Sequence, residues 1–325
     1  MGEGRILWVD TAKTLGIFLV FWGHTLYSGS HVASEINRAI YSFHMPMFFV
    51  LSGYVVKTEI GNLGNFINKK YKRIILPALF FYVLTLPLFF FHIDVSDSGI
   101  CSIIESVFYV YGELAYDKPV WFFVCLFQIY ILSKIINLSK VKAKLLVLLC
   151  TLCLILSCLS YMSDCKLFSL FGFNKCILGL FFYTCGMMLK RTNYRNYMFR
   201  VGLFLLPVWL LTGVILNSKI SMYDMSLGCF SLFIISSLTG TLVFFPICKV
   251  LEKIIIIREY AKWTVFIVSS HYILVSLLAN LSSSFEFDDS FFYDIISFSF
   301  VIISFVIYYP ICKWGEKNIP LLMGR

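Results

Sequence analysis

Ten continuous apolar stretches divide the chain, and most of them have the length of a membrane-crossing helix. A helical span needs about 20 mostly apolar residues to cross about 30 Å of hydrocarbon. The stretches are residues 8–27, 39–56, 74–92, 119–136, 145–162, 174–189, 199–216, 225–249, 263–281 and 291–311. Their apolar runs are continuous rather than alternating, which argues against an outer-membrane β-barrel. The pattern therefore predicts an all-α, polytopic integral membrane protein with about ten transmembrane helices in a single domain, residues 1–325.

The lysines and arginines between these stretches fall mainly on one side. If the N-terminus, the even-numbered loops and the C-terminus share a side, that side holds 21 Lys and Arg residues and the opposite side holds 5. Lys13 lies inside the first stretch and completes the 27. Because loops rich in Lys and Arg stay in the cytoplasm, we expect both termini there. The net charge of +9 is then mostly a topology signal and not a nucleic-acid patch.

The composition excludes several classes of protein. Hydrophobic residues make up 59% of the chain and charged residues only 14%, whereas a soluble globular protein has about 25% charged residues. A soluble enzyme, a disordered chain and a secreted disulfide scaffold are therefore excluded. The 11 cysteines lie mostly within the apolar stretches and show no metal-ligand spacing. We expect them to pack as small hydrophobic residues and expect no metal site.

His24 is the first candidate for chemistry, because ionisable residues inside a membrane are costly and often functional. It lies 14 residues beyond Asp10 in the first stretch, which is about 21 Å along a helix. His24 is therefore expected near the outer leaflet, where its imidazole suits a general base for a hydroxyl group. A structural role as a helix–helix hydrogen-bonding residue stays open. Asp10 and Lys13 share a helix face, so a supporting ion pair is the simple explanation for Asp10.

His44 lies in the second stretch at a depth similar to that of His24. Because the two stretches run in opposite directions across the membrane, the two histidines can share one polar site. Pro46 has no backbone N–H, so it is expected to free a carbonyl one turn earlier and to bend the helix there. The alternative for His44 is a structural partner of His24 or of a backbone carbonyl.

The densest basic cluster lies between the second and third stretches, on the predicted cytoplasmic side. It comprises Lys69, Lys70, Lys72 and Arg73. Positive-inside charge or contact with anionic lipid is one explanation. The functional interpretation is a site for the phosphates of a nucleotide-like ligand, which Lys and Arg suit.

Two further residues complete the candidates within the stretches. Trp121 opens the fourth stretch on the outer side, either as an ordinary interfacial aromatic residue or as a substrate contact. His271 lies about nine residues into the ninth stretch, near mid-membrane. We expect a structural or supporting role for it.

Taken together, these residues resemble the acyltransferase family 3 of integral membrane acyltransferases, and most of all its branch related to fucose 4-O-acetylase. The two stretches that carry the resemblance read Asp10-x-x-Lys13-x-x-Gly16-Ile17-x-Leu19-Val20-x-x-Gly23-His24-Thr25 and Phe43-His44-Met45-Pro46-Met47-Phe48-Phe49-x-x-Ser52-Gly53-Tyr54. The family's basic motif has its counterpart in Lys70-x-x-Arg73, with Lys where the family usually has Arg, and Trp121-Phe122-Phe123 is similar to a Trp-Phe-Leu element. Weaker patterns match Gly179–Gly186 and Ser270-His271-Tyr272, so the resemblance covers nearly the whole chain.

The resemblance implies that an acyl group, commonly acetyl, passes from acyl-CoA to a hydroxyl of a glycan or its lipid-linked precursor. His24 would be catalytic, with His44 assisting it, and the donor acetyl-CoA would be held by the cationic residues Lys13, Lys70, Lys72 and Arg73. We expect the acceptor on the outer side, in contact with Trp121 and with the loop residues Glu113, Tyr116 and Asp117. For the loop residues, an ordinary solvated loop is the alternative. The expected location is a lipid bilayer, the inner membrane of a bacterium.

Two other functions fit a chain of this composition. A transporter or flippase for a glycan precursor would need an alternating-access pathway, and the sequence shows neither an internal repeat nor charge at mid-membrane. A glycan polymerase typically needs large outer loops, whereas the longest loop here is residues 93–118. The sequence therefore favours the acyltransferase.

Overall fold

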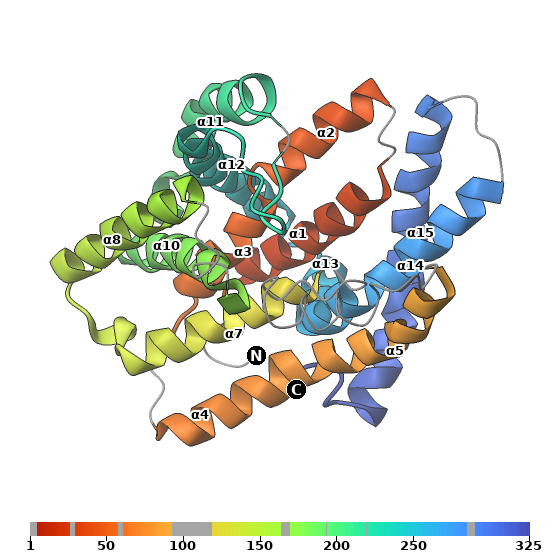
Figure 1. Ribbon diagram of the computed structural model, residues 1–325, viewed down its shortest axis with the longest axis horizontal. Helices are drawn as coiled ribbons and strands as arrows, with labels where there is room; N and C mark the ends of the chain where they lie inside the picture. The colour runs from red at the N-terminus through yellow and green to blue at the C-terminus, as the bar shows by residue number, and fades with distance from the viewer. Residues whose placement is uncertain are drawn as a thin grey trace. The chain divides into compact units, whose positions relative to one another are not determined.

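A computed structural model describes residues 5–26, 30–57, 61–92, 119–163, 170–192, 194–218, 220–284 and 290–325 (Figure 1). These residues are almost entirely helical, and the β-type pairing among them is limited to an isolated bridge between Ser221 and Ser226. The prediction of an all-α protein is therefore confirmed for the described part of the chain.

The described residues form the following α-helices, in chain order. They are α1 (Leu7–Thr25), α2 (His31–Tyr41), α3 (His44–Tyr54), α4 (Leu63–Lys70), α5 (Leu76–His92), α7 (Val120–Ile135), α8 (Ala143–Met162), α10 (Phe173–Arg191), α11 (Tyr194–Trp209), α12 (Phe230–Leu251), α13 (Ile255–Tyr260), α14 (Thr264–Ser284) and α15 (Ser290–Asn318). Two π-helical segments, η1 (Tyr71–Ile75) and η4 (Leu210–Ile215), continue α4 and α11. Three short 3₁₀ turns complete the set: η2 (Leu138–Lys140), η3 (Leu170–Gly172) and η5 (Ala261–Trp263).

Each of the ten predicted apolar stretches overlaps a helix of the described chain. Five of these helices are long and apolar enough to cross a membrane, namely Ala143–Met162, Tyr194–Ile215, Phe230–Leu251, Ile255–Leu281 and Phe292–Asn318. The apolar helix α7 is shorter. The number of about ten spans and the cytoplasmic termini stay predictions.

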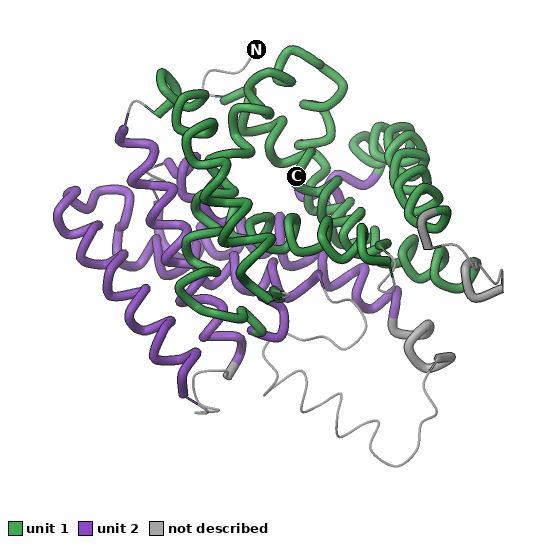
Figure 2. The backbone as a smooth tube through the Cα atoms, turned by 90° about the horizontal axis from the view of Figure 1, so that it is seen from above, with its two compact units in different colours: residues 1–48, 194–221, 226–318 green, residues 49–193, 222–225, 319–325 purple. Residues whose placement is uncertain are grey.

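The chain forms two compact units (Figure 2). Unit 1 comprises Met1–Phe48, Tyr194–Ser221 and Ser226–Asn318, and unit 2 comprises Phe49–Asn193, Met222–Met225 and Ile319–Arg325. In unit 1, α1 packs against α2, α12, α13, α14 and α15, and α11 lies beside α12. In unit 2, α10 packs against α7 and α8.

The second predicted stretch is broken in unit 1, between α2 and α3. Pro46 cannot donate a hydrogen bond to the carbonyl of Ser42 one turn earlier. The hydroxyl of Ser237 donates to that carbonyl at 2.8 Å instead, and the indole Nε1 of Trp209 donates to the Ser42 hydroxyl at 2.9 Å. The bend predicted from Pro46 is therefore present, and α12 and α11 supply the polar partners that it needs.

Two glycines allow α3 and α10 to touch backbone to backbone in unit 2. A Cβ atom on Gly53 would overlap the carbonyl oxygen of Tyr183, and one on Gly186 would overlap the carbonyl oxygen of Val50. Small residues at such crossings let helices approach closely, as is common in membranes. The glycines in these two segments thus fix the distance between α3 and α10.

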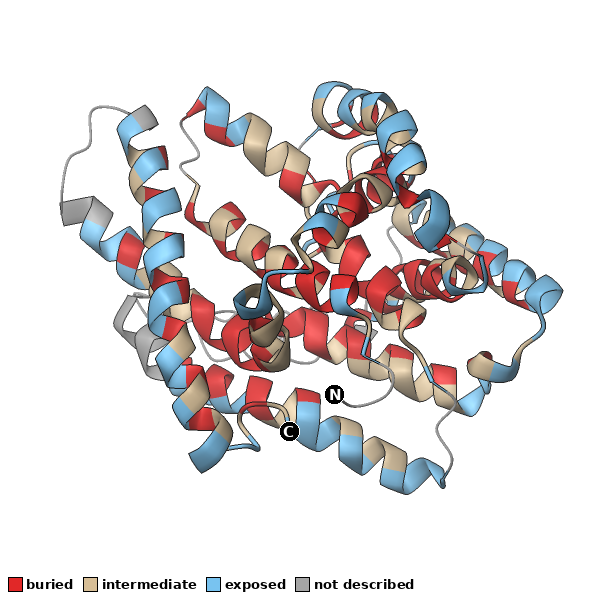
Figure 3. Cartoon of the chain, turned by 180° about the vertical axis from the view of Figure 1, so that it is seen from behind, coloured by how far each residue is buried: buried red, intermediate tan, exposed pale blue. Residues whose placement is uncertain are grey.

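Many helices have an exposed face (Figure 3). Large apolar side chains lie on these faces. Leu203 and Phe204 in α11 are 75% and 77% exposed, and Val306 in α15 is 67% exposed. Soluble monomers rarely expose apolar patches of this extent, whereas lipid accepts them. The exposed faces and the apolar helices identify a membrane protein.

Candidate active site

His24 lies in the last turn of α1 and is partly accessible. Its Nδ1 is 3.3 Å from the hydroxyl oxygen of Tyr41 in α2. The approach of the two helices depends on Gly23, because a Cβ atom there would lie 2.9 Å from the Tyr41 ring. A small residue before the histidine therefore lets the tyrosine reach the imidazole.

Tyr41 also links His24 to His44, which begins α3. The Tyr41 ring centroid is 6.1 Å from that of His24 and 4.8 Å from that of His44. His44 is buried, and its Nδ1 is 2.8 Å from the carbonyl oxygen of Ile40. Since a carbonyl only accepts, Nδ1 carries the proton, and Nε2 of the neutral ring is an acceptor. Nε2 of His44 can therefore accept a hydrogen bond from a hydroxyl group, but it has no proton with which to stabilise an oxyanion.

His271 in α14 is the third histidine of this cluster in unit 1. Its ring centroid is 5.6 Å from that of His24, and the neighbouring Tyr272 ring is 5.8 Å from His24. The sequence predicts His271 near mid-membrane and thus at a different depth from His24, because the ninth apolar stretch begins at residue 263. The helical segment begins at Ile255 with α13, so His271 lies as far along its segment as His24 lies along α1.

Tyr41 and Tyr272 are site residues that the sequence analysis missed. Tyr41 lies three residues before His44 and Tyr272 directly after His271. A search for polar side chains beside each intramembrane histidine would have found both.

Asp10 and Lys13 lie at the opposite end of α1 from His24. Asp10 is 7% exposed and accepts a hydrogen bond from Arg5, while the ammonium of Lys13 is 4.0 Å from its other oxygen. The hydroxyl of Thr14 donates to the carbonyl of Ile257 at 2.7 Å and ties this end of α1 to α13. The contacts of Asp10 fit the predicted supporting role, and Lys13 is engaged in the same ion-pair group.

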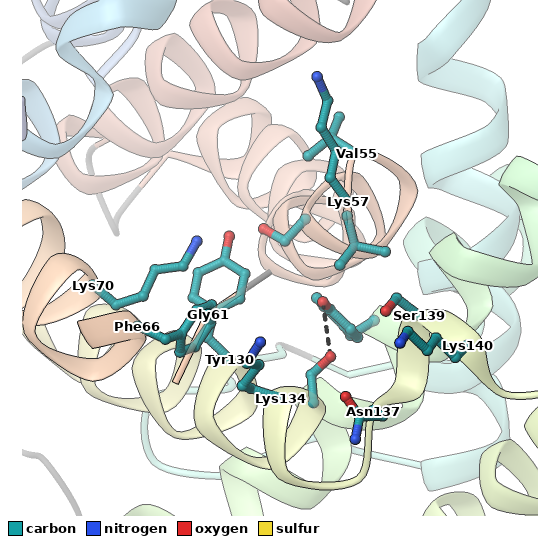
Figure 4. A pocket seen from close by; sticks show the side chains of 14 residues that line it. Val55, Lys57, Gly61, Phe66, Lys70, Tyr130, Lys134, Asn137, Ser139 and Lys140 are labelled. Carbon is teal, nitrogen blue, oxygen red and sulfur yellow. Dashed lines mark hydrogen bonds between the residues drawn. The ribbon is translucent and has the colours of Figure 1, made fainter. Parts of the chain in front are cut away.

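A cavity of about 450 Å³ lies within unit 2 beside the predicted donor cluster (Figure 4). Its described lining includes no acidic side chain, and four lysines line it: Lys57, Lys70, Lys134 and Lys140. The ammonium of Lys70 lies 4.2 Å from the Tyr130 ring centroid, an arrangement that stabilises a cation. The hydroxyls of Ser133 and Tyr183, also in the lining, are 3.2 Å apart.

A further cation lies next to the cavity lining, since the ammonium of Lys190 donates to the carbonyl oxygen of Val56. Partial burial, and in second place the charge of Lys57, lower the pKa of Lys190 in α10. Positive groups gathered without acidic neighbours in the lining favour an anion, and ammonium groups with hydroxyls suit phosphate. We call the space lined by the four lysines the lysine pocket.

The predicted basic cluster is divided by the structure. Lys70 lines the lysine pocket, whereas Lys72 and Arg73 are exposed on η1 and do not line it. The other lysines of the lining are Lys57, Lys134 and Lys140. The sequence predicts only a topology role for these three. They share the predicted side of the membrane with Lys70, but so do most lysines of the chain, so the sequence alone does not distinguish them.

Trp121 is 5% exposed at the start of α7 in unit 2. The ammonium of Lys175 lies 5.7 Å from its ring centroid and 5.3 Å from that of Tyr223. Lys175 is itself 2% exposed, so Trp121 forms part of a buried aromatic setting for a cation. The other predicted acceptor contacts, Glu113, Tyr116 and Asp117, lie outside the described residues.

The thiols and carboxylates of the described residues are candidate metal ligands. The described cysteines are all free, and most are buried. Within the same residues, no group of three or more His, Cys, Asp or Glu side chains is placed to hold a metal ion.

The fold and the site define a helical membrane protein that has a partly accessible histidine in a polar cluster of unit 1 and a pocket lined by four lysines in unit 2. A family model described as an acyltransferase domain matches residues 6–309. The chain therefore belongs to this acyltransferase family, the one that the motifs around His24 and His44 resemble. Neither a curated protein nor a solved structure matches the chain.

Proposed function

We propose that this membrane acyltransferase is an O-acyltransferase that moves an acetyl group from acetyl-CoA to a hydroxyl of a surface glycan or of its lipid-linked precursor. The observation that carries the proposal is His24, the accessible member of a group of three histidines in a chain of the acyltransferase family. The resemblance to the branch related to fucose 4-O-acetylase supports a sugar hydroxyl as acceptor.

In the proposed reaction His24 removes the proton of the acceptor hydroxyl as its oxygen attacks the thioester carbon. The Tyr41 oxygen accepts the Nδ1–H of His24, which leaves Nε2 as the base. The carbon–sulfur bond then breaks, and the leaving sulfur takes the proton back from His24. A route through an acyl-histidine intermediate uses the same residue as nucleophile.

The lysine pocket is the proposed site for the phosphates of the donor. Its four lysines offer ammonium groups to a polyanion, and Tyr130 and Phe66 provide aromatic surface beside them. Lys72 and Arg73 would then attract the donor from the exposed surface without enclosing it. The lysines of the pocket, Lys72 and Arg73 all belong to the side that we propose to be cytoplasmic, where CoA is found.

A transporter or flippase, or a glycan polymerase, is the alternative. No contact among the described residues favours either of them over the acyltransferase. In the proposal the protein lies in the inner membrane of a bacterium, with Trp121 and the 93–118 loop on the acceptor side.

The acetyl content of surface glycans tests the proposed function. Glycans from cells that carry the gene, lack it, or carry a His24→Ala copy are compared by mass spectrometry and proton NMR. We expect O-acetyl signals with the wild-type gene alone. Equal O-acetylation in all three strains would contradict the proposal.

A further inference from the structure

His271 has a defined protonation pattern. Its Nδ1 is 2.7 Å from the carbonyl oxygen of Val268, one turn earlier in α14. Because a carbonyl only accepts, the ring proton is on Nδ1, and Nε2 of the neutral imidazole carries a lone pair. The backbone of α14 therefore fixes which nitrogen of His271 is an acceptor.

That acceptor is left unsatisfied. His271 is 0% exposed, and its Nε2 is buried without a hydrogen-bond partner. A buried acceptor without a partner is destabilising and uncommon in native proteins. Since Nδ1 is turned back towards its own helix, Nε2 on the opposite edge of the ring is directed away from it.

The surroundings of His271 offer one neighbour that gains a proton in the proposed reaction. The Phe21 ring centroid, 5.4 Å away, belongs to an apolar side chain. The His24 ring centroid is 5.6 Å away on the same helix, α1. The two rings are adjacent, so a hydrogen bond between their nitrogens requires His24 to turn and to shift slightly towards His271. The remaining polar rings nearby are Tyr272, and Tyr41 beyond His24.

We propose that His271 is a positioning residue for His24, and that its Nε2 accepts the N–H of His24 while His24 carries the proton. The proposal rests on the proposed function. The proton leaves the acceptor hydroxyl for Nε2 of His24 as the oxygen–carbon bond forms. His24 then turns this N–H to Nε2 of His271, and it turns back to pass the proton to the sulfur as the carbon–sulfur bond breaks. His271 itself gains and loses no proton and does not touch the substrate.

Two amide substitutions separate this role from simple packing. His271→Asn keeps an N–H near the position of Nδ1, so the bond to Val268 is retained, but the distal acceptor is lost. His271→Gln places a carbonyl oxygen near the position of Nε2 and so restores the acceptor. If His271 were purely structural, with Nε2 bonded to a buried water, His271→Asn would not have a lower kcat than His271→Gln.

The experiment measures turnover of labelled acetyl-CoA, with glycerol as the hydroxyl acceptor, by the full-length protein in lipid nanodiscs. Expected is a fall in kcat of about 10- to 100-fold for His271→Asn, less than the full contribution of a general base. His271→Gln is expected to stay within about threefold of wild type. KM for acetyl-CoA stays constant in both, because the lysine pocket is untouched.

Several results would overturn the role of His271. They are equal kcat for wild type and His271→Asn, equal losses in both variants, or a loss confined to KM. If His271→Asn is not recovered as folded protein, His271→Gln decides alone: retained kcat supports the role, and a fall in kcat at constant KM overturns it. Failure of the proposed function has a different signature, since wild type itself would then not turn over acetyl-CoA.

Discussion

His24 differs from its two neighbouring histidines in access. His44 and His271 are 4% and 0% exposed, and each has its Nδ1 on a backbone carbonyl of its own chain segment. His24 is partly accessible, and its Nδ1 faces the Tyr41 hydroxyl. Of the three, His24 is therefore the one whose side chain is partly exposed.

Replacing Tyr41 by Phe tests how His24 is held. The substitution keeps the ring against His24 and His44 but removes the oxygen that, in the proposed reaction, accepts the Nδ1–H. We expect kcat for acetyl-CoA turnover to fall about tenfold, because less of His24 then has Nε2 as the free base. Tyr197→Phe, at an exposed position of α11, is the matched control and should behave as wild type. Equal kcat for both variants would remove Tyr41 from the site.

Donor affinity distinguishes the lysines of the pocket from the exposed basic residues. Lys70→Ala removes an ammonium that lines the pocket, whereas Lys72→Ala removes one on the exposed face of η1. We expect Lys70→Ala to raise the Kd for CoA about tenfold and Lys72→Ala to raise it less than threefold at physiological salt. Calorimetric titration of the purified protein measures both. A larger effect from Lys72 would place the donor outside the lysine pocket.

How far the site could be predicted differs from residue to residue. His24, His44 and Lys70 stand out in the sequence because a histidine inside an apolar stretch and a dense basic cluster are both unusual. Lys57, Lys134 and Lys140 do not, since lysines in cytoplasmic loops are expected for topology alone. Only the folding of α3, α7 and η2 around one cavity distinguishes them.

At the scale of helices, single residues set the breaks and crossings. Pro46 predicts the break at Ser42, because the missing N–H is a local consequence of the sequence. The start of the ninth helical segment was not predictable in the same way. Residues 254–257 are apolar but are flanked by Lys253 and Arg258, and charges on both sides of a short apolar run are typical of a loop. Residues 255–260 instead form α13, which lengthens the helical segment before α14 and brings His271 to the level of His24.

The crossing of α3 and α10 is tested by adding one carbon atom. Gly53→Ala and Gly186→Ala each place a methyl group against a backbone carbonyl of the other helix. We expect a loss of about 1–3 kcal/mol in stability, seen as a lower Tm of the purified protein. Gly64→Ala in α4, where the nearest atom is 3.9 Å from the new carbon, should leave Tm unchanged or raise it. Equal Tm values for all three variants would contradict the close crossing.

At the scale of the whole molecule, the charge distribution predicts the orientation in the membrane. With 21 Lys and Arg residues on one side and 5 on the other, both termini should be cytoplasmic. A fluorescent protein fused after Arg325 should therefore fluoresce, and alkaline phosphatase fused within the 93–118 loop should be active. An active phosphatase at the C-terminus would contradict the orientation and would put the lysine pocket on the wrong side for CoA.

Turnover of labelled acetyl-CoA by the purified protein tests most directly whether His24 carries the chemistry. Wild type is compared with His24→Ala and with His31→Ala, which changes an exposed histidine at the start of α2. We expect equal rates for wild type and His31→Ala and a loss of about 100-fold or more for His24→Ala. Equal rates for wild type and His24→Ala, in transfer and in hydrolysis, would contradict a catalytic role for His24.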